Sequence, residues 1–248
     1  MNGKRKVIIL GDSFTFGHSC SDRIFYYDHD LKTFIGDEKP FMENIPSKYC
    51  WPALLQEKYN NIEVVNLAKP ANCNQGMFRD LIEYNSKNDV NEGDILMCHG
   101  TFPTRIEIAS GDRPEVATPW VMGWDHQSQM ESKLEYNVAK KLYLTHLFND
   151  TIGSNLSLTA LLSSYAFAIT HNLKFVWSLP VYVYDNYVLN TLRPINKFRL
   201  THICKYDFSG KDNYEFNKDC FAPDYHVNDK GHAIYLEREI MPIMQTLL

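Results

Sequence analysis

Short apolar runs alternate along this chain with longer segments of helical periodicity. The first run, Val7-Ile8-Ile9-Leu10, has four consecutive apolar residues and predicts a strand that is buried on both faces. Further buried strands are predicted at 62–67, 94–99 and 173–180. Apolar residues at helical spacing predict helices at 51–59, 76–85, 134–150, 154–171 and 228–248. Strands that alternate with helices favour an α/β domain with a central parallel sheet and right-handed crossovers.

Two segments interrupt this alternation. Residues 18–48 are rich in Asp, Tyr and Phe and carry two prolines, and residues 104–131 hold several Gly, Pro and Trp residues. Such composition predicts irregular insertions, which near a sheet edge shape a pocket, a lid or an interface flap. Residues 181–222 are aromatic and mixed, and no element is predicted there. We therefore expect one domain over residues 1–248, with insertions at about 18–48 and 104–131.

Composition and charge narrow the class of protein. The 248 residues are 44% hydrophobic and 22% charged, which is typical of a globular chain. The net charge is −5 and the only basic run is Lys4-Arg5-Lys6, so no nucleic-acid partner is expected. Aromatic residues reach 13%, a surplus that suits a core, sugar stacking or the interface of a homo-oligomer.

The six cysteines form no C-x-x-C pair and have no metal-ligand spacing. We expect them to be reduced, and we expect no metal or cofactor. No apolar leader precedes the first strand, and no apolar run approaches the length of a membrane span. These features predict a cytoplasmic protein with no membrane span, and a virion component would look the same.

The first strand is followed directly by Gly11-Asp12-Ser13. In open α/β sheets the reactive crevice lies at the carboxyl ends of the strands, where Ser13 would present its hydroxyl. Asp and Ser are also favoured helix N-caps, so this tripeptide alone suits a cap as well as a nucleophile.

A second polar constellation precedes the last predicted helix, at Asp224-Tyr225-His226. A histidine can take the proton of a serine hydroxyl, and an aspartate beside it can fix the tautomer of the imidazole. Asp-x-His is common by itself. Its position matters here, because the loop after the first strand and the loop before the last helix can open on the same sheet edge.

These motifs, in this order, resemble the SGNH (GDSL-like) hydrolase family. The resemblance rests on Gly11-Asp12-Ser13 after a strand, and on Asp224-x-His226 with Asn228 and Gly231-His232 before the C-terminal helix. Between them, Asn66-Leu67-Ala68-Lys69-Pro70-Ala71-Asn72 falls where the second block of the family begins with asparagine. The order and spacing of these motifs span nearly the whole chain.

The resemblance implies a flavodoxin-like three-layer α/β/α fold and ester hydrolysis, often of acyl groups on carbohydrates or lipids. By position, Ser13 would be the nucleophile, His226 the base and Asp224 its orienting acid. The backbone N–H of Ser13 would be one donor of the oxyanion hole, the set of hydrogen-bond donors that stabilises the charged reaction intermediate.

The sequence departs from the family pattern at two donors of this hole. Ala71 stands where the second block has glycine, and a backbone N–H survives there if φ is compatible. The third block, normally Gly-x-Asn-Asp, is matched by His99-Gly100-Thr101-Phe102, so Phe102 replaces the asparagine donor. Losing such a donor costs roughly 3–4 kcal/mol of transition-state stabilisation. The candidate substitutes are Asn74, which we prefer, Thr101 and Asn72.

Three further polar residues are candidate substrate-binding groups: Asp12, His99 and Arg105. His99 ends a predicted strand and lines the pocket or lies in the core. Arg105 would hold an anionic group of a substrate, or it forms an ion pair with Glu107 or Glu131. His232 is interpreted as a structural histidine on the last helix.

The sequence therefore predicts a serine esterase that hydrolyses a small acyl ester, acetyl by preference, on a carbohydrate. The aromatic insertions and the lack of a long apolar lid motivate this substrate. One alternative is a binding or structural module, such as a virion protein, that keeps the fold with weakened catalysis. Another is an acyltransferase, in which an alcohol outcompetes water.

Overall fold

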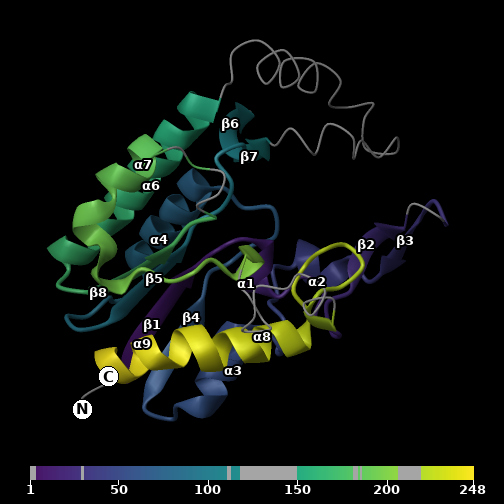
Figure 1. The fold of residues 1–248 in the computed structure, drawn as a ribbon, viewed down its shortest axis with the longest axis horizontal. Coiled ribbons are helices and arrows are strands. Elements are labelled where there is room, and N and C mark those ends of the chain that lie inside the picture. The colour runs from purple at the N-terminus through teal and green to yellow at the C-terminus, as the bar shows by residue number, and fades with distance from the viewer. Residues whose placement is uncertain are drawn as a thin grey trace.

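A computed structural model describes residues 4–28, 31–110, 113–117, 150–180, 184, 186–205 and 219–248. Its centre is a four-stranded parallel sheet in the order β4-β1-β5-β8. The strands are β1 (Arg5–Leu10), β4 (Ile62–Asn66), β5 (Ile95–His99) and β8 (Lys174–Ser178). The first strand of the chain thus occupies an inner position, and the polypeptide winds outward from it in both directions (Figure 1).

Strand β1 is buried on both faces, as its apolar run predicts. Val7 and Ile9 pack into a core cluster with the helices of one face, and Ile8 and Leu10 pack into a second cluster on the other. All four side chains are at most 1% exposed. Successive side chains of a strand point to opposite faces, so four consecutive apolar residues supply two cores at once.

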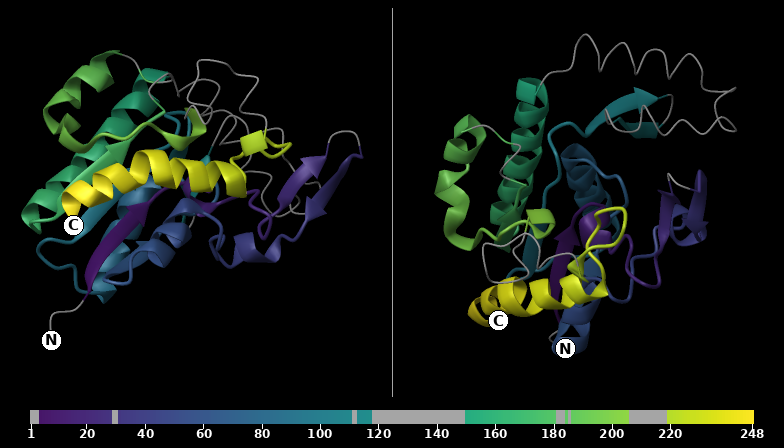
Figure 2. Two further views of the ribbon diagram at one scale, coloured as in Figure 1. Left: turned by 60° about the horizontal axis from the view of Figure 1, so that its bottom comes forward. Right: turned by 45° about the vertical axis from the view of Figure 1, so that its right-hand side comes forward.

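Helices cover both faces of this sheet (Figures 1 and 2). One face carries α3 (Trp51–Lys58), α8 (Asp229–Tyr235), the π-helical turn η6 (Leu236–Ile240) and α9 (Met241–Leu247). The other carries α4 (Asn74–Lys87), α6 (Asp150–Thr170), α7 (Asn186–Thr191) and the 3₁₀ helix η3 (Arg193–Phe198). The predicted three-layer α/β/α fold with a central parallel sheet is confirmed.

The elements agree closely with the sequence pattern in the sheet and differ from it elsewhere. The predicted helix at 228–248 is one continuous segment with a π-helical turn in its middle. The predicted helix at 134–150 falls outside the described residues except at its last position. In the region without a predicted element, the structure adds α7, η3 and the short 3₁₀ helix η4 (Ile203–Lys205).

Each predicted insertion contains a small antiparallel hairpin. The first holds β2 (Phe25–Asp28), β3 (Thr33–Gly36) and the single-turn helix α2 (Lys39–Met42). The second holds β6 (Ile106–Ser110) and β7 (Arg113–Ala117). Both pairs lie outside the central sheet, and β2–β3 extends away from it (Figures 1 and 2). Strands of four or five residues that pair only with each other carry little periodic signal, so the sequence pattern suggested loops.

One helix, α6, meets the length and hydropathy expected of a membrane span, over Thr151–Thr170 with a mean hydropathy of 1.3. Half of that window is buried inside the protein, and α6 packs against α4. The core helix of a globular domain meets the same criterion, and α6 supplies core residues to one face of the sheet.

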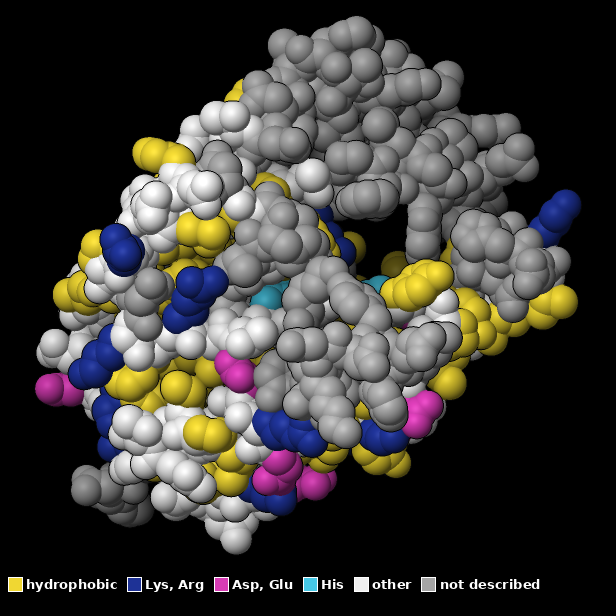
Figure 3. Space-filling view, viewed as in Figure 1, with side chains coloured by type: hydrophobic (Ala, Val, Ile, Leu, Met, Phe, Trp, Pro, Cys, Tyr) yellow, Lys and Arg dark blue, Asp and Glu magenta, His cyan; other side chains and the backbone are white. Residues whose placement is uncertain are grey.

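The surface and the cysteines agree with the composition. Basic and acidic side chains are interspersed over the described part of the face in Figure 3. All six cysteines are free thiols, and five of them are buried.

Candidate active site

Ser13 begins a short helix at the carboxyl end of β1. The helix is α1 (Ser13–Phe16), and Asp12 caps it by accepting a hydrogen bond from the backbone N–H of Phe14 at 3.0 Å. Gly17 ends the helix with a φ of +84°, a left-handed conformation that favours glycine. A helix cap and an available serine hydroxyl therefore occur together here, because Asp12 provides the cap and the hydroxyl of Ser13 takes no part in it.

The hydroxyl of Ser13 meets His226 from the far end of the chain. Ser13 Oγ lies 3.0 Å from His226 Nε2, and His226 Nδ1 lies 3.0 Å from Asp224 Oδ2. Asp224 and His226 lie on the loop before α8. Asn228 caps the first turn of α8 by accepting a hydrogen bond from the N–H of Gly231. If Nδ1 of His226 donates to the carboxylate, Nε2 is left to accept the Ser13 proton. This is the hydrogen-bond order of a serine–histidine–aspartate triad.

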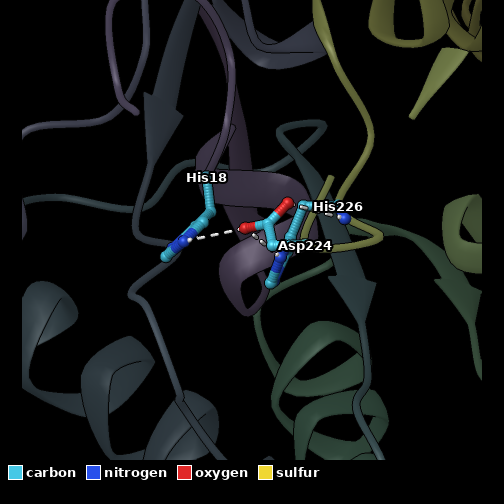
Figure 4. Close-up of side chains that lie close together, drawn as sticks. All are labelled: His18, Asp224 and His226. Carbon is cyan, nitrogen blue, oxygen red and sulfur yellow. Dashed lines mark hydrogen bonds and ion pairs between the residues drawn. The ribbon is translucent and has the colours of Figure 1, made fainter. Parts of the chain in front are cut away.

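His226 is not the only residue that contacts the carboxylate of Asp224 among the described residues. Its Oδ2 accepts from the hydroxyl of Ser19 at 2.5 Å and lies 3.4 Å from Nε2 of His18, and its Oδ1 accepts from the N–H of His226 at 3.2 Å (Figure 4). Burial opposes ionisation, but the hydrogen bonds from His18, His226 and Ser19 outweigh it and hold the pKa of Asp224 well below its ordinary value. Asp224 is therefore an anion throughout the physiological pH range.

The imidazole of His226 lies between two rings. Its centroid is 4.3 Å from that of His18, with an interplanar angle of 25°, and 4.9 Å from that of Phe14. Burial lowers the pKa of His226 below its ordinary value of 6.5, and the hydrogen bond to Asp224 opposes this shift only in part. The ring is therefore neutral, and able to accept a proton, at neutral pH.

This lowered pKa predicts the pH dependence of the site. A base must be unprotonated to act, so the acid limb of the pH profile of kcat/KM should have its midpoint below pH 6.5. The profile can be measured with nitrophenyl acetate from about pH 5 to 8, with intrinsic fluorescence recorded at each pH to show that the protein stays folded. A midpoint at or above 6.5 would contradict the prediction.

His18, Asp224 and His226 also form a group of possible metal ligands. One ligand atom of each lies within 4.8 Å of the others. The two imidazole rings are nearly parallel, however, so their in-plane lone pairs do not converge on one point as tetrahedral coordination requires. The contacts of these side chains fit a hydrogen-bonded network better than a metal site.

Two backbone N–H groups remain for an oxyanion hole. Neither the N–H of Ser13 nor that of Ala71 has an acceptor among the described residues. The turn that contains Ala71 is joined to the end of β1 by a hydrogen bond from the N–H of Lys69 to the carbonyl of Gly11. Ala71 has a φ of +57°, so it keeps the left-handed backbone that a glycine would adopt, at a strain of roughly 1–2 kcal/mol.

The three side chains expected to replace the missing asparagine are all engaged elsewhere. Asn74 is 5% exposed; its Nδ2 lies within 3.1 Å of acceptors on Thr101, Ser157 and Tyr184, and its Oδ1 accepts from the N–H of Thr101. The hydroxyl of Thr101 donates to Asp12 at 2.6 Å. The amide of Asn72 donates to Asp80. The structure therefore offers backbone donors at this position and no free amide from these residues.

Asn74 instead fastens the third-block loop to α4, so its removal should destabilise the fold. Asn74→Ala leaves the buried N–H of Thr101 without its acceptor, and we expect a loss of about 2–3 kcal/mol in the free energy of unfolding. Urea unfolding followed by fluorescence measures it. Asn88→Ala, which removes an exposed amide bound only to the carbonyl of Tyr84, is the matched control. Equal losses in both variants would contradict this role.

Asp12, the residue before Ser13, forms a partly buried ion pair with Arg105. Arg105 Nη1 lies 2.9 Å from Asp12 Oδ2 and 3.5 Å from the carbonyl of Asn72. Asp12 is fully buried, so it is placed to orient this turn rather than to contact substrate. Arg105 thus forms an ion pair with Asp12. The partners expected from the sequence, Glu107 and Glu131, have side chains that lie outside the described part of the chain.

His99 and His232 lie in the core. His99 is 0% exposed, receives or donates one hydrogen bond with Ser178 at 2.9 Å and packs on Trp51. His232 accepts from the backbone N–H of Trp51 at 3.2 Å and so caps the start of α3. His99 therefore does not line a crevice, and His232 has the structural role that its place on the last helix suggests.

The comparisons with known proteins identify the fold. No protein-family model matches the sequence, and no curated protein matches it. Among solved structures, the esterase EstA from Pseudoalteromonas sp. matches with a TM-score of 0.54 and 12% identity, over 97% of this chain and 99% of that one. A protein assigned to the G-D-S-L lipolytic family from Desulfitobacterium hafniense matches with a TM-score of 0.50 and 12% identity, over 98% and 99%.

The chain has the α/β fold of the SGNH (GDSL) hydrolases. The matches extend over nearly the whole of each chain, and the three layers around a parallel sheet are those that the resemblance implies. At 12% identity this likeness concerns the fold. What the site does follows from its own geometry.

Sequence reasoning missed two residues of the site, His18 and Ser19. They follow α1 in a stretch that reads as the start of a loop, and their partner Asp224 is about 205 residues away. The single signal was proximity to Gly17, since the residues after a helix-ending glycine stay close to the helix that carries Ser13.

Proposed function

We propose that this protein is a serine ester hydrolase with Ser13 as nucleophile, His226 as base and Asp224 as its orienting acid. The observation that carries the proposal is the unbroken series of contacts from Ser13 Oγ to His226 and from His226 to Asp224, each 3.0 Å long. Contacts of this length within one site match the geometry that general-base activation of a serine requires.

In the proposed reaction, Ser13 Oγ bonds to the ester carbonyl carbon while its proton passes to Nε2 of His226. The tetrahedral oxyanion is stabilised by the N–H groups of Ser13 and Ala71. The bond to the leaving alcohol then breaks, and the alcohol takes the proton from His226. A water molecule, deprotonated by the same imidazole, releases the acid and regenerates Ser13. Asp224 stabilises the imidazolium that forms in each half.

We propose a short acyl group, acetyl by preference, on a carbohydrate as the substrate. Tyr225 supports a sugar ligand, because it stands between Asp224 and His226 with 83% of its surface exposed, and an aromatic face can stack on a sugar ring. The first insertion supports it less, since Phe25 stacks on Phe34 at 5.1 Å and on Phe41 at 5.6 Å and these rings cover one another.

Covalent labelling tests the nucleophile. A fluorophosphonate probe phosphonylates an activated serine, and EstA was crystallised inhibited by monoethylphosphonate. We expect labelling of Ser13 in the intact protein, located by peptide mass spectrometry, and none after heat denaturation. Absence of labelling at Ser13 would exclude the proposed hydrolase.

One observation favours a second candidate, a binding or structural module with the same fold. Phe102 stands where the family has its side-chain oxyanion donor, and Asn74, Thr101 and Asn72 are engaged with other groups. A module of this kind would bind an acylated carbohydrate without turning it over. Titration calorimetry with an acetylated oligosaccharide, together with an assay for released acetate, separates the two candidates.

A further inference from the structure

We propose that His18 is a positioning residue for the base, His226. Its ring packs on one face of His226, and its N–H helps to fix the carboxylate of Asp224, which in turn orients His226. The inference rests on the proposed function, in which His226 is the base and Asp224 its partner. The stacked pair and the carboxylate are drawn in Figure 4.

The tautomer of His18 follows from its backbone partner. Nε2 of His18 lies 2.8 Å from the carbonyl oxygen of Phe25, which can only accept, so Nε2 carries the proton. The same N–H is directed near Asp224 Oδ2, at 3.4 Å. This N–H therefore lies between the carboxylate of Asp224 and the first strand of the β2–β3 hairpin.

His18 and Phe14 both restrict the ring of His226. The centroid of the His18 ring lies 4.3 Å from that of His226, with an interplanar angle of 25°, and the centroid of the Phe14 ring lies 4.9 Å from it, with an angle of 33°. An imidazole in such a layer cannot rotate about its χ2 angle without losing both contacts. The layer thus holds Nε2 toward Ser13 and Nδ1 toward Asp224.

The stack also bears on the charge that develops during reaction. His226 becomes a cation in the transition state of the proposed reaction, and Asp224 is an anion that contacts both imidazoles. Within hydrogen-bond distance in the described part of the chain, Asp224 is the one charged group that faces His18; its other neighbours are the Phe25 carbonyl and the ring of Phe41.

Three variants separate the two contributions. His18→Phe keeps an aromatic face and removes the N–H, His18→Asn keeps a donor and removes the ring, and His18→Ala removes both. We expect kcat for nitrophenyl acetate to fall by about 10–100-fold in His18→Ala and by less in the other two, with KM unchanged, because positioning of the base matters only in the transition state. His171→Phe, whose ring stacks on Phe167 beyond the end of α6, is the control and should match the parent.

The pKa of His226 distinguishes a positioning role of His18 from a purely structural one, because loss of a purely structural contact would leave this pKa unchanged. Burial is the main cause of the lowered pKa of His226, and the neighbouring imidazole of His18 lowers it further. This pKa should therefore rise toward 6.5 in His18→Phe, as measured by NMR of the imidazole in protein that keeps its parental Tm. An unchanged kcat in folded His18→Ala, or an unchanged His226 titration in folded His18→Phe, would overturn the proposal. The NMR measurement needs no turnover. Absence of fluorophosphonate labelling at Ser13 in the parental protein would therefore contradict the proposed hydrolase. An unchanged pKa of His226 in His18→Phe would instead contradict the positioning role of His18.

Discussion

Ser13→Ala should lower kcat for nitrophenyl acetate by about 10⁴–10⁶-fold, because the variant retains the oxyanion donors and the binding surface but has no atom to form the acyl-enzyme. Stability should change little, since the substitution removes one hydroxyl hydrogen bond, worth about 1 kcal/mol. Steady-state hydrolysis and reaction with the fluorophosphonate probe both measure the effect. Residual activity within tenfold of the parent would assign the chemistry to another group.

A serine close by provides the control for this experiment. Ser21 lies on the segment after α1, and its hydroxyl donates to Asp229 at 2.6 Å rather than to any member of the triad. Ser21→Ala removes the same atoms from the same region of the chain. We expect it to hydrolyse nitrophenyl acetate at the parental rate, so that a loss restricted to Ser13→Ala reports on the nucleophile.

Acid should unfold the protein between about pH 6 and 4, through three histidines that are buried in their neutral form. Burial lowers the pKa of His99 to about 3, of His202 to about 4 and of His232 to about 3, against 6.5 in the unfolded chain. Below pH 6.5 the unfolded state therefore binds more protons than the folded state, and stability falls as the pH falls. Three such groups give a slope of about 4 kcal/mol per pH unit.

Urea unfolding at several pH values measures this slope. His232→Asn keeps an acceptor for the N–H of Trp51 and removes one titrating group, so the slope should fall by about 1.4 kcal/mol per pH unit. Asn88→Ala, which removes an exposed amide that does not titrate, is the control and should keep the parental slope. Stability that stays constant from about pH 6.5 to 5 would show that these histidines are protonated in the folded state.

The sheet and the contact between Ser13 and His226 were predictable because the residues that form them follow local patterns. Continuous apolar runs such as Val7-Ile8-Ile9-Leu10 have one stable environment, a strand between two helical layers. The functional assignments of Ser13 and His226 remain proposals. That the two could meet was an inference from topology, because parallel strands deliver the loops at their carboxyl ends to one edge.

The surroundings of the triad could not be predicted, because they depend on contacts between distant segments. Arg105 pairs with Asp12 across 93 positions, and Ser19 meets Asp224 across 205. A charged residue in a sequence has many possible partners, and only the folded geometry selects one. The amide of Asn74 likewise contacts Thr101, Ser157 and Tyr184, which are distant in the sequence, and the expectation that it supplies an oxyanion donor stays a prediction.

The order in which the two halves of the site are synthesised has a consequence for the nascent chain. His226 is translated 213 positions after Ser13. At typical elongation rates of 5–20 residues per second, the serine exists for roughly 10–40 s before its base has been made. In the proposed hydrolase, Ser13 would lack its base during that interval, whatever part of the sheet has already formed. The proposed activity would therefore begin only after the loop that carries His226 has been made and has folded against α1.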